Sequence, residues 1–233
     1  MMDARRQAYL DAMGIRVWVR RQSAPEPESA FVSDEQAPPV SDFERMALDW
    51  DELAARVGVC ERCPQLVASR TRTVFGVGSH KADLMVIGEA PGADEDHQGQ
   101  LFVGDSGKLL DKMLRAAGFS RRTVYLATIV KCRPPDDRDP EPDELSACVG
   151  YLRRQIELVN PGVILAVGTA AESLLEADRP TGPLRGDVHR YLVTDTPVIV
   201  THNPAHLLCS PAEKREVWDD LRLLKRVYGR AIT

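Results

Sequence analysis

The stretch GEAPGADEDHQGQLFVG, residues 88–104, stands between an apolar run at 84–87 and a helical pattern at 106–117. The run LMVI predicts a buried strand, because it is short, apolar and followed by turn-forming residues. A loop that is rich in glycine and proline and holds four acidic residues therefore follows the carboxyl end of a strand, where open α/β sheets build their sites. The alternative is a solvated acidic turn.

Apolar strands alternate with helical patterns through the rest of the chain. Four runs predict strands, at residues 83–88, 123–130, 163–168 and 191–201. Helical spacing of apolar residues predicts helices at 53–57, 106–117, 142–159, 169–177 and 212–227. Such alternation predicts an α/β fold with a parallel sheet that is covered by helices on both faces.

Composition limits the class of protein. Apolar residues make up 43% of the 233 residues, which is enough for a core. No apolar run approaches the roughly 18 residues of a membrane span. Because no apolar signal segment follows the basic N-terminus, we expect a cytoplasmic protein that does not contact a membrane. The net charge of −5 at first argues against a nucleic-acid partner.

The charge is unevenly distributed, and this divides the chain into parts. Residues 1–22 carry five Arg and two Asp, whereas residues 23–52 carry nine acids and one Arg. The remainder is balanced, so a basic DNA-binding face on it is compatible with the net charge. We predict a basic, aromatic segment at 1–22, a disordered acidic Pro-rich linker at 23–45 and a folded domain at 46–233. The first segment either docks on a protein partner or folds back on the core.

Five cysteines indicate a metal centre rather than disulfides, because no secretory signal is found. Cys60 and Cys63 form a Cys-x-x-Cys pair, and Cys132 and Cys148 flank a Pro-rich turn between a predicted strand end and the next helix. Four converging thiolates suit either a [4Fe–4S] cluster or zinc, and the alternative is four inert buried thiols. Cys209 has no partner in the pattern, and we expect it to be free.

These motifs together resemble the iron–sulfur uracil-DNA glycosylases, family 4 of the uracil-DNA glycosylase superfamily. The resemblance covers about residues 48–230 and rests on CERCP at 60–64, GEAPGADED at 88–96, FVG at 102–104, KCRPP at 131–135 and NPAHLL at 203–208. It implies a three-layer α/β/α domain with a central four-stranded parallel sheet. It also implies that a [4Fe–4S] cluster is bound by Cys60, Cys63, Cys132 and Cys148.

The resemblance implies a reaction on uracil-containing DNA, single- or double-stranded, and we expect a monomer. Uracil is flipped out of the stack, its N-glycosidic bond is hydrolysed and an abasic site remains. Phe102 matches the family's phenylalanine that stacks on the base, and the loop with Gly88 and Ala90 matches the part that lines the pocket. A carboxylate near the sugar stabilises its developing cation or orients water, a role we predict for Glu89 and next for Glu95.

Two positions depart from the family pattern. The family has an Asn that reads the uracil edge where this chain has Thr128, and one hydroxyl cannot reproduce the paired contact of an amide. The family's His, which donates toward the departing uracil, is replaced by Asn203, which donates from its NH2 group but cannot become positively charged. His202 and His206 flank Asn203, either as substitutes or, as we favour, in packing or surface roles.

Two functions are compatible with the sequence. The first is a uracil-DNA glycosylase with weak activity or altered base preference. The second is a non-enzymatic, cluster-bearing DNA binder that has kept the fold and lost the base-reading groups. A nucleotide-binding enzyme of another class is disfavoured, because the chain has no Gly-x-Gly-x-x-Gly or Walker loop.

Overall fold

The computed structural model describes residues 48–175 and 184–231, and the structural statements below concern these residues. The predictions for segment 1–22 and linker 23–45 lie outside the described residues. The described chain contains a six-stranded sheet with the order β1-β3-β2-β4-β6-β5. Its strands are β1 Val77–Gly78, β2 Leu84–Gly88, β3 Val124–Thr128, β4 Val163–Val167, β5 Val188–Tyr191 and β6 Thr196–Thr201.

Four parallel strands form the centre of the sheet. β3, β2, β4 and β6 pair in parallel, whereas β1 and β5 pair antiparallel at the two edges. All residues of β2, β3 and β4 are buried, as parallel strands that are covered on both faces require. The register pairs Gly88, the last residue of β2, with Thr128, the last residue of β3. The strand ends therefore bring two predicted site residues together.

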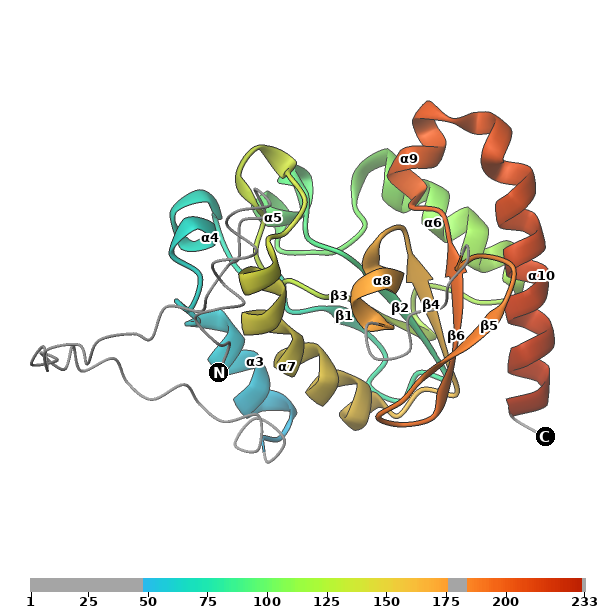
Figure 1. Cartoon of the computed structure of the whole chain (residues 1–233), viewed down its shortest axis with the longest axis horizontal. Coiled ribbons are helices and arrows are strands. Elements are labelled where there is room, and N and C mark those ends of the chain that lie inside the picture. The colour runs from blue at the N-terminus through green and yellow to red at the C-terminus, as the bar shows by residue number, and fades with distance from the viewer. Residues whose placement is uncertain (1–47, 176–183, 232–233) are drawn as a thin grey trace, which may run out of the picture. The chain divides into compact units, whose positions relative to one another are not determined.

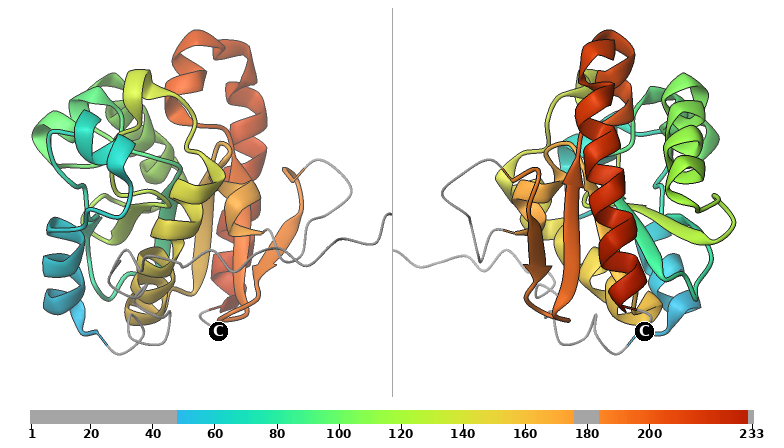
Figure 2. Two further views of the ribbon diagram at one scale, coloured as in Figure 1. Left: turned by 60° about the vertical axis from the view of Figure 1, so that its left-hand side comes forward. Right: turned by 90° about the vertical axis from the view of Figure 1, so that its right-hand side faces the viewer.

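Helices cover both faces of this sheet (Figure 1 and Figure 2). One face packs against α3, α7 and α8, and the other packs against α6, α9 and α10. This arrangement confirms the predicted three-layer α/β/α fold. The helices are α3 Trp50–Gly58, α4 Pro64–Ser69, α5 Ala93–Gln98, α6 Gly104–Ala117, α7 Pro142–Val159, α8 Ala170–Leu174, α9 Pro204–Cys209 and α10 Lys214–Ala231, with short 3-10 turns η1 Pro135–Asp137 and η3 Pro211–Glu213.

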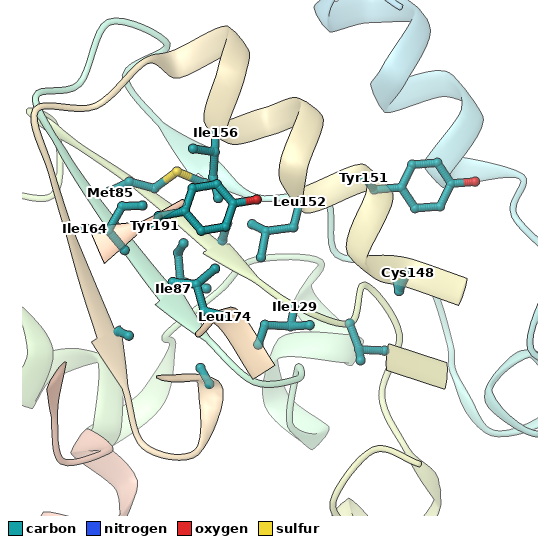
Figure 3. Packing of buried hydrophobic residues seen from close by; sticks show 14 of the residues in the cluster. Met85, Ile87, Ile129, Cys148, Tyr151, Leu152, Ile156, Ile164, Leu174 and Tyr191 are labelled. Atoms are coloured by element: carbon teal, nitrogen blue, oxygen red, sulfur yellow. The ribbon is translucent and has the colours of Figure 1, made fainter. Parts of the chain in front are cut away.

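One apolar strand supplies side chains to the cores on both faces. Met85 and Ile87 of β2 belong to the same core as Leu152 and Ile156 of α7 (Figure 3). Val86, between them in sequence, belongs to the core on the other face. Side chains alternate along a strand, so the continuous run predicted at 84–87 serves both layers.

Helix boundaries follow capping signals in the sequence. α3 begins after Asp49, whose Oδ1 accepts the N–H of Glu52 at 2.9 Å, while Glu52 Oε2 accepts the N–H of Asp49 at 3.0 Å. α7 begins at Pro142, which is favoured in a first helical turn. α6 ends at Gly118, which has the left-handed φ of 92° that a helix end favours. None of the described helices is long and apolar enough to cross a membrane.

Two predictions of local structure are wrong. The run at 191–201 forms parts of two strands, because the chain turns at 192–195, where Asp195 has a φ of 54° and its carbonyl accepts from Arg190 Nη1 at 2.9 Å. The stretch at 88–96 is not a loop throughout, because α5 begins at Ala93. The sequence patterns also do not predict β1, α4 or α9, which are too short to show a clear periodicity.

Candidate functional site

A cavity of about 460 Å³ opens at the carboxyl ends of the central strands. The end of β2, the loop after it, the end of β3 and the N-terminus of α9 contribute to its walls, as expected for an open α/β sheet. It is lined by every residue predicted for substrate binding or catalysis, namely Gly88, Glu89, Ala90, Glu95, Phe102, Thr128 and Asn203. Separate segments of the chain therefore meet at one site.

A larger cavity, of about 560 Å³, is lined by α7, α8 and β5 together with the turn after β5. Most of its lining side chains are apolar, and none of the predicted site residues is among them. Size and apolar lining alone would favour this larger cavity. The smaller cavity is the candidate site because all the residues predicted for substrate binding and catalysis converge there.

Phe102 forms an aromatic wall of the cavity in an unusual backbone conformation. Its φ angle is 51°, in the left-handed region, and the residue is only 7% exposed. Its N–H donates to Glu95 Oε1, and its carbonyl accepts from Arg121 Nη2 at 2.6 Å. Because the neighbours hold both backbone polar groups, the surrounding structure fixes this strained residue.

Arg121 and Gly107 support Phe102 from the side of α6. Arg121 Nη1 donates to the carbonyl of Leu101 at 3.0 Å, and Arg121 Nε donates to Asp111 Oδ1 at 2.9 Å. A Cβ at Gly107 would lie 1.8 Å from the carbonyl oxygen of Phe102, so only glycine fits there. The sequence analysis missed Arg121, because it lies in the connection between α6 and β3 and belongs to no motif.

Glu95 lines the cavity, but backbone donors occupy both of its oxygens. Oε2 accepts the N–H of Gly92 at 2.7 Å, and Oε1 accepts that of Phe102. Burial raises the pKa of Glu95, while these hydrogen bonds and the charge of Arg121 act in the opposite direction. The carboxylate therefore positions the loop and the aromatic wall, and its contact with substrate stays a prediction.

Asp96 anchors the same loop to the segment after α4. The residue is 2% exposed, and its carboxylate accepts the N–H groups of Thr71, at 2.8 Å, and Arg72, at 3.1 Å. Burial acts against ionisation, but the hydrogen bonds outweigh it and lower the pKa of Asp96. Two successive acids in the first turn of α5 thus bind backbone N–H groups.

Thr128 and Asn203 form the polar wall of the cavity. Thr128 is 2% exposed, and its hydroxyl has no hydrogen-bond partner in the part of the chain that the structure describes. Buried polar groups are normally paired, so this hydroxyl is available to a ligand once a small rearrangement exposes its oxygen to the cavity. Asn203 Oδ1 accepts the N–H of Ala205 at 2.9 Å and caps α9, which leaves the NH2 group of the amide for a ligand.

Glu89 directly follows β2, and its backbone carbonyl accepts the N–H of Val130 at 2.9 Å. The hydroxyl of Thr169, which precedes α8, donates to Glu89 Oε2. The other carboxylate oxygen can face a substrate or a water molecule. Gly168, directly before Thr169, allows Asn203 to pack closely against the backbone. A Cβ at Gly168 would lie only 3.2 Å from Asn203 Cβ.

Arg138 and Ser106 also line the cavity, and the sequence analysis missed both. Arg138 donates to the two carboxylate oxygens of Glu144 at 2.7 and 2.8 Å, a bidentate pairing that fixes the guanidinium. Glu144 also accepts the N–H of Glu141 at 2.8 Å at the start of α7. No local pattern indicates Arg138, because an acidic first helical turn is already stabilised by the helix dipole and needs no cation.

A third, small cavity is lined by the four cysteines predicted as metal ligands, Cys60, Cys63, Cys132 and Cys148. The first two lie between α3 and α4, the third follows β3, and the fourth lies on α7, where Figure 3 shows it. Cys209 is exposed at the end of α9 and does not line this cavity. The folded chain therefore brings the four cysteines to one cavity, and their role as metal ligands stays a prediction.

Hydrogen-bond donors face the cysteine sulfurs. Arg70 Nη1 donates to Cys132 Sγ at 2.8 Å, and the backbone N–H of Lys131 donates to Cys148 Sγ at 3.3 Å. Burial raises the pKa of Cys148 to about 12, although the charge of Lys131 acts against it. Metal ligation needs thiolates, so a metal centre bound here would release protons as it forms.

Lys131 contacts both sites. Its side chain is buried, and Nζ donates to the carbonyl of Thr128 and to Gln155 Oε1, both at 2.6 Å. Burial lowers the pKa of Lys131 to about 8, while the cysteines Cys148 and Cys132 act in the opposite direction. The residue thus joins the strand end that carries Thr128 to the cysteine cavity.

His202 and His206 do not line the cavity, although both flank Asn203 in the described chain. His202 Nε2 lies 2.9 Å from Glu216 Oε2, and His206 Nε2 lies 2.8 Å from Glu213 Oε2. These contacts favour the surface role over the role of substitutes for the missing histidine.

Several known proteins are similar in sequence to this chain. The family model of the Uracil DNA glycosylase superfamily matches residues 75–222. The type-4 uracil-DNA glycosylase of Archaeoglobus fulgidus is 36% identical over 187 residues, which cover 77% of this chain and 94% of that protein. The type-4 uracil-DNA glycosylase of Thermotoga maritima is 38% identical over 177 residues, which cover 74% of this chain and 91% of that protein. A type-5 uracil-DNA glycosylase of Pyrobaculum aerophilum is 32% identical over 152 residues, or 52% of this chain.

Proposed function

The chain belongs to the uracil-DNA glycosylase superfamily, among the type-4 enzymes, and on this premise we propose how it excises uracil from DNA. The reaction hydrolyses the N-glycosidic bond and leaves an abasic site. Family membership favours this activity over the non-enzymatic DNA-binding alternative. The site that we propose for it is the cavity lined by Phe102, Thr128 and Asn203.

The observation that carries the proposal is that seven residues predicted from the sequence line one cavity of about 460 Å³. A base inside a duplex cannot be reached by an enzyme, so uracil must be flipped out into such a cavity. The cavity offers an aromatic face for stacking and, on another wall, polar groups for the base edge.

In this proposal the base lies against Phe102, with its edge toward the polar wall. After a small rearrangement exposes it, the hydroxyl of Thr128 makes one hydrogen bond to that edge and so gains the partner that it lacks among the described residues. An amide at this position would offer a donor and an acceptor together. The hydroxyl therefore discriminates uracil from other bases less strongly.

Bond cleavage needs charge stabilisation on both sides of the scissile bond. The C1′–N1 bond breaks, its electron pair leaves with uracil, and the sugar becomes cationic before water adds to C1′. The NH2 group of Asn203 donates to the uracil oxygen where negative charge develops. The carboxylate of Glu89 stabilises the sugar cation or orients the water molecule.

Single-turnover excision from single-stranded DNA with one uracil tests this proposal. We expect slow but measurable abasic-site formation by the parent protein, because both polar positions depart from the family pattern. Asn203→Ala should reduce the rate further, and cytosine in the same position should not be excised. If the parent releases no uracil above an Asn203→Ala, Glu89→Ala double variant, the cavity is not a working glycosylase site.

We further propose that Cys60, Cys63, Cys132 and Cys148 bind a [4Fe–4S] cluster. When bound, the cluster cross-links the chain before α4, the segment after β3 and α7. The donors from Arg70 and Lys131 suit thiolate sulfurs that carry negative charge.

The described cysteines do not form a preformed site for a single zinc ion. In the described chain, no three cysteine sulfurs lie within 4.8 Å of one another. A tetrahedral zinc ion with Zn–S distances of about 2.3 Å needs its sulfurs about 3.8 Å apart. A larger, four-iron centre fits wider spacing.

Anaerobic purification tests the nature of the centre. The protein should be brown, with broad visible absorption and about four iron atoms per chain when fully loaded. Cys132→Ala should remove the colour and lower the melting temperature, whereas Cys209→Ala, at an exposed cysteine outside the cavity, should change neither. A colourless protein with stoichiometric zinc would contradict the cluster.

The protein partner and the oligomeric state are also proposals. We propose that the domain acts on DNA as a monomer and that residues 1–22, with five Arg, bind an acidic protein surface. Light scattering should give a mass near 25.8 kDa. A version that lacks residues 1–45 should keep the excision rate on oligonucleotides, and a lower melting temperature for it would favour the alternative that the segment folds back on the core.

A further inference from the structure

Two histidines and a glutamate form a cluster beside α10 that lines neither the substrate cavity nor the cysteine cavity. Among the described residues, only His202, His206 and Glu213 form a group of metal-ligating side chains whose ligand atoms all lie within 4.8 Å of one another. We propose that this cluster binds one divalent transition-metal ion, with Zn²⁺ as the best match.

The three side chains come from three nearby positions along the chain. His202 follows β6, His206 lies in α9, and Glu213 ends η3 directly before α10. Figure 1 shows how the chain turns from α9 into α10 at one end of the domain. The two imidazole rings are stacked, with centroids 5.7 Å apart and an interplanar angle of 29°. This stacking directs a nitrogen of each ring toward the same carboxylate.

The distances fit a single small ion. Glu213 Oε2 lies 2.8 Å from His206 Nε2 and 3.4 Å from His202 Nδ1. A tetrahedral zinc ion at about 2.0–2.1 Å from its nitrogen and oxygen ligands needs these atoms about 3.4 Å apart. The observed distances need only small side-chain adjustments to reach that value.

Glu216 holds His202 from its outer side. His202 Nε2 lies 2.9 Å from Glu216 Oε2, and Arg185 Nη1 donates to the same carboxylate. A neutral ring that donates its Nε2–H to Glu216 turns the lone pair of Nδ1 toward Glu213. Metal-bound histidines use such a carboxylate on the second ring nitrogen to fix their tautomer and orientation.

The carboxylates around the cluster also favour the binding of a cation. Glu213, Glu216 and Asp220 carry three negative charges, and Arg185, which donates to Asp220 Oδ2 at 2.9 Å, carries one positive charge. Arg185 pairs with Glu216 and Asp220. The ion-pair contacts of Glu213 are instead with the two imidazoles, so a divalent ion between them would pair with its charge. Imidazole together with carboxylate suits Zn²⁺, and three protein ligands with a water molecule complete a tetrahedral site.

The ion would fix the segment that carries Asn203. His202 and His206 lie on either side of Asn203, whose amide lines the substrate cavity. A shared ion would connect the end of β6 and α9 to the start of α10. The metal would therefore stabilise the position of Asn203 without contacting the base. This inference is independent of the glycosylase assignment, because its test measures metal binding.

Titration of the full-length protein with Zn²⁺, with its cysteine-bound centre intact, tests the proposal. At Zn²⁺ concentrations that saturate the site in the parent, the parent should bind one more equivalent of Zn²⁺ than His206→Ala or Glu213→Gln. The affinity of these two variants for Zn²⁺ at this site should be at least tenfold lower. Glu216→Gln should weaken binding about 10- to 100-fold. His97→Ala removes an exposed histidine on α5 and is the matched control, which should bind as the parent does.

Co²⁺ distinguishes this site from the cysteines. Ligation by nitrogen and oxygen gives visible bands without the intense thiolate-to-metal charge-transfer absorption. We expect the nitrogen and oxygen spectrum in the parent and in Cys209→Ala, and its loss in His206→Ala. Equal Zn²⁺ stoichiometry and affinity in the parent and His206→Ala, or a Co²⁺ spectrum with thiolate bands alone, would overturn the proposal.

Discussion

The two walls of the substrate cavity are built in opposite ways. On the aromatic wall, Glu95 and Arg121 hold both backbone polar groups of Phe102. On the polar wall, the Thr128 hydroxyl has no partner in the described chain, and Asn203 uses only its oxygen as a helix cap. The aromatic wall is preorganised, whereas we propose that the ligand completes the polar wall. The two departures from the family pattern both lie on the polar wall, where hydrogen-bonding capacity is unused.

The largest effect is expected from Gly107→Ala, which breaks the aromatic wall. The added Cβ would lie 1.8 Å from the carbonyl oxygen of Phe102, so the backbone must move. We expect a loss of stability of about 3 kcal/mol or more, as for other substitutions that overpack a core, together with loss of uracil excision. Denaturant unfolding and single-turnover excision measure the two effects.

Gly229→Ala is the matched control for this change. Gly229 lies within α10, and a Cβ there would meet nothing within 4 Å. Alanine should stabilise this helix by up to about 1 kcal/mol. Equal stability changes for the two variants would contradict the tight fit at Gly107.

Phe102→Ala should have the next largest effect. Stacking of a base on an aromatic side chain contributes about 1–3 kcal/mol, which corresponds to roughly 5- to 150-fold in rate or affinity. Binding of uracil-containing single-stranded DNA and excision should both fall. The melting temperature should fall as well, because Phe102 is also part of the buried core, and Phe102→Leu, which keeps most of the apolar volume, separates the loss of stacking from the loss of stability. A rate that is unchanged in Phe102→Ala would show that the base does not lie on this wall.

Sequence and structure contribute differently to the two walls. Phe102, Thr128 and Asn203 could be predicted because they match positions of a family motif. The supports of Phe102 could not, because Arg121 acts through its geometry and Gly107 through the absence of a Cβ, which no local pattern records. The central strands were predictable from apolar runs, whereas β1 has two residues and β5 is largely exposed, so neither gives a clear signal.

Arg121 should be a positioning residue, with a smaller effect than Phe102. Arg121→Met removes the donors to the carbonyls of Leu101 and Phe102, and we expect excision to fall about tenfold, equivalent to about 1.4 kcal/mol. Arg121→Lys keeps one charged donor and should restore part of the rate. The loss should appear in the apparent substrate affinity as well as in the rate. Equal activities in the parent and both variants would exclude this role.

Glu95→Gln should have a mild effect that depends on pH. The ionised carboxylate accepts two backbone N–H groups, and glutamine can accept only at its oxygen. Burial raises the pKa of Glu95 above the usual glutamate value of about 4.3. As the pH falls, the excision rate should therefore begin to decline at a pH above this value. The stability contribution has the opposite sign: a raised folded pKa stabilises at low pH, and this contribution is lost as the pH rises through that pKa. The acid limb of the excision profile should be absent in Glu95→Gln.

The measurement that tests the account most directly is single-turnover uracil excision by Thr128→Asn, Asn203→His, their double variant and the parent. One missing buried hydrogen bond costs about 1–3 kcal/mol, and a weaker donor to the leaving oxygen costs about 2.7–4 kcal/mol. Together they correspond to roughly three to five powers of ten in rate if they add. We predict weak excision by the parent and a double variant well above either single variant. Robust excision by the parent that falls in the double variant would contradict the account, because Thr128 and Asn203 would then form a different, working polar wall.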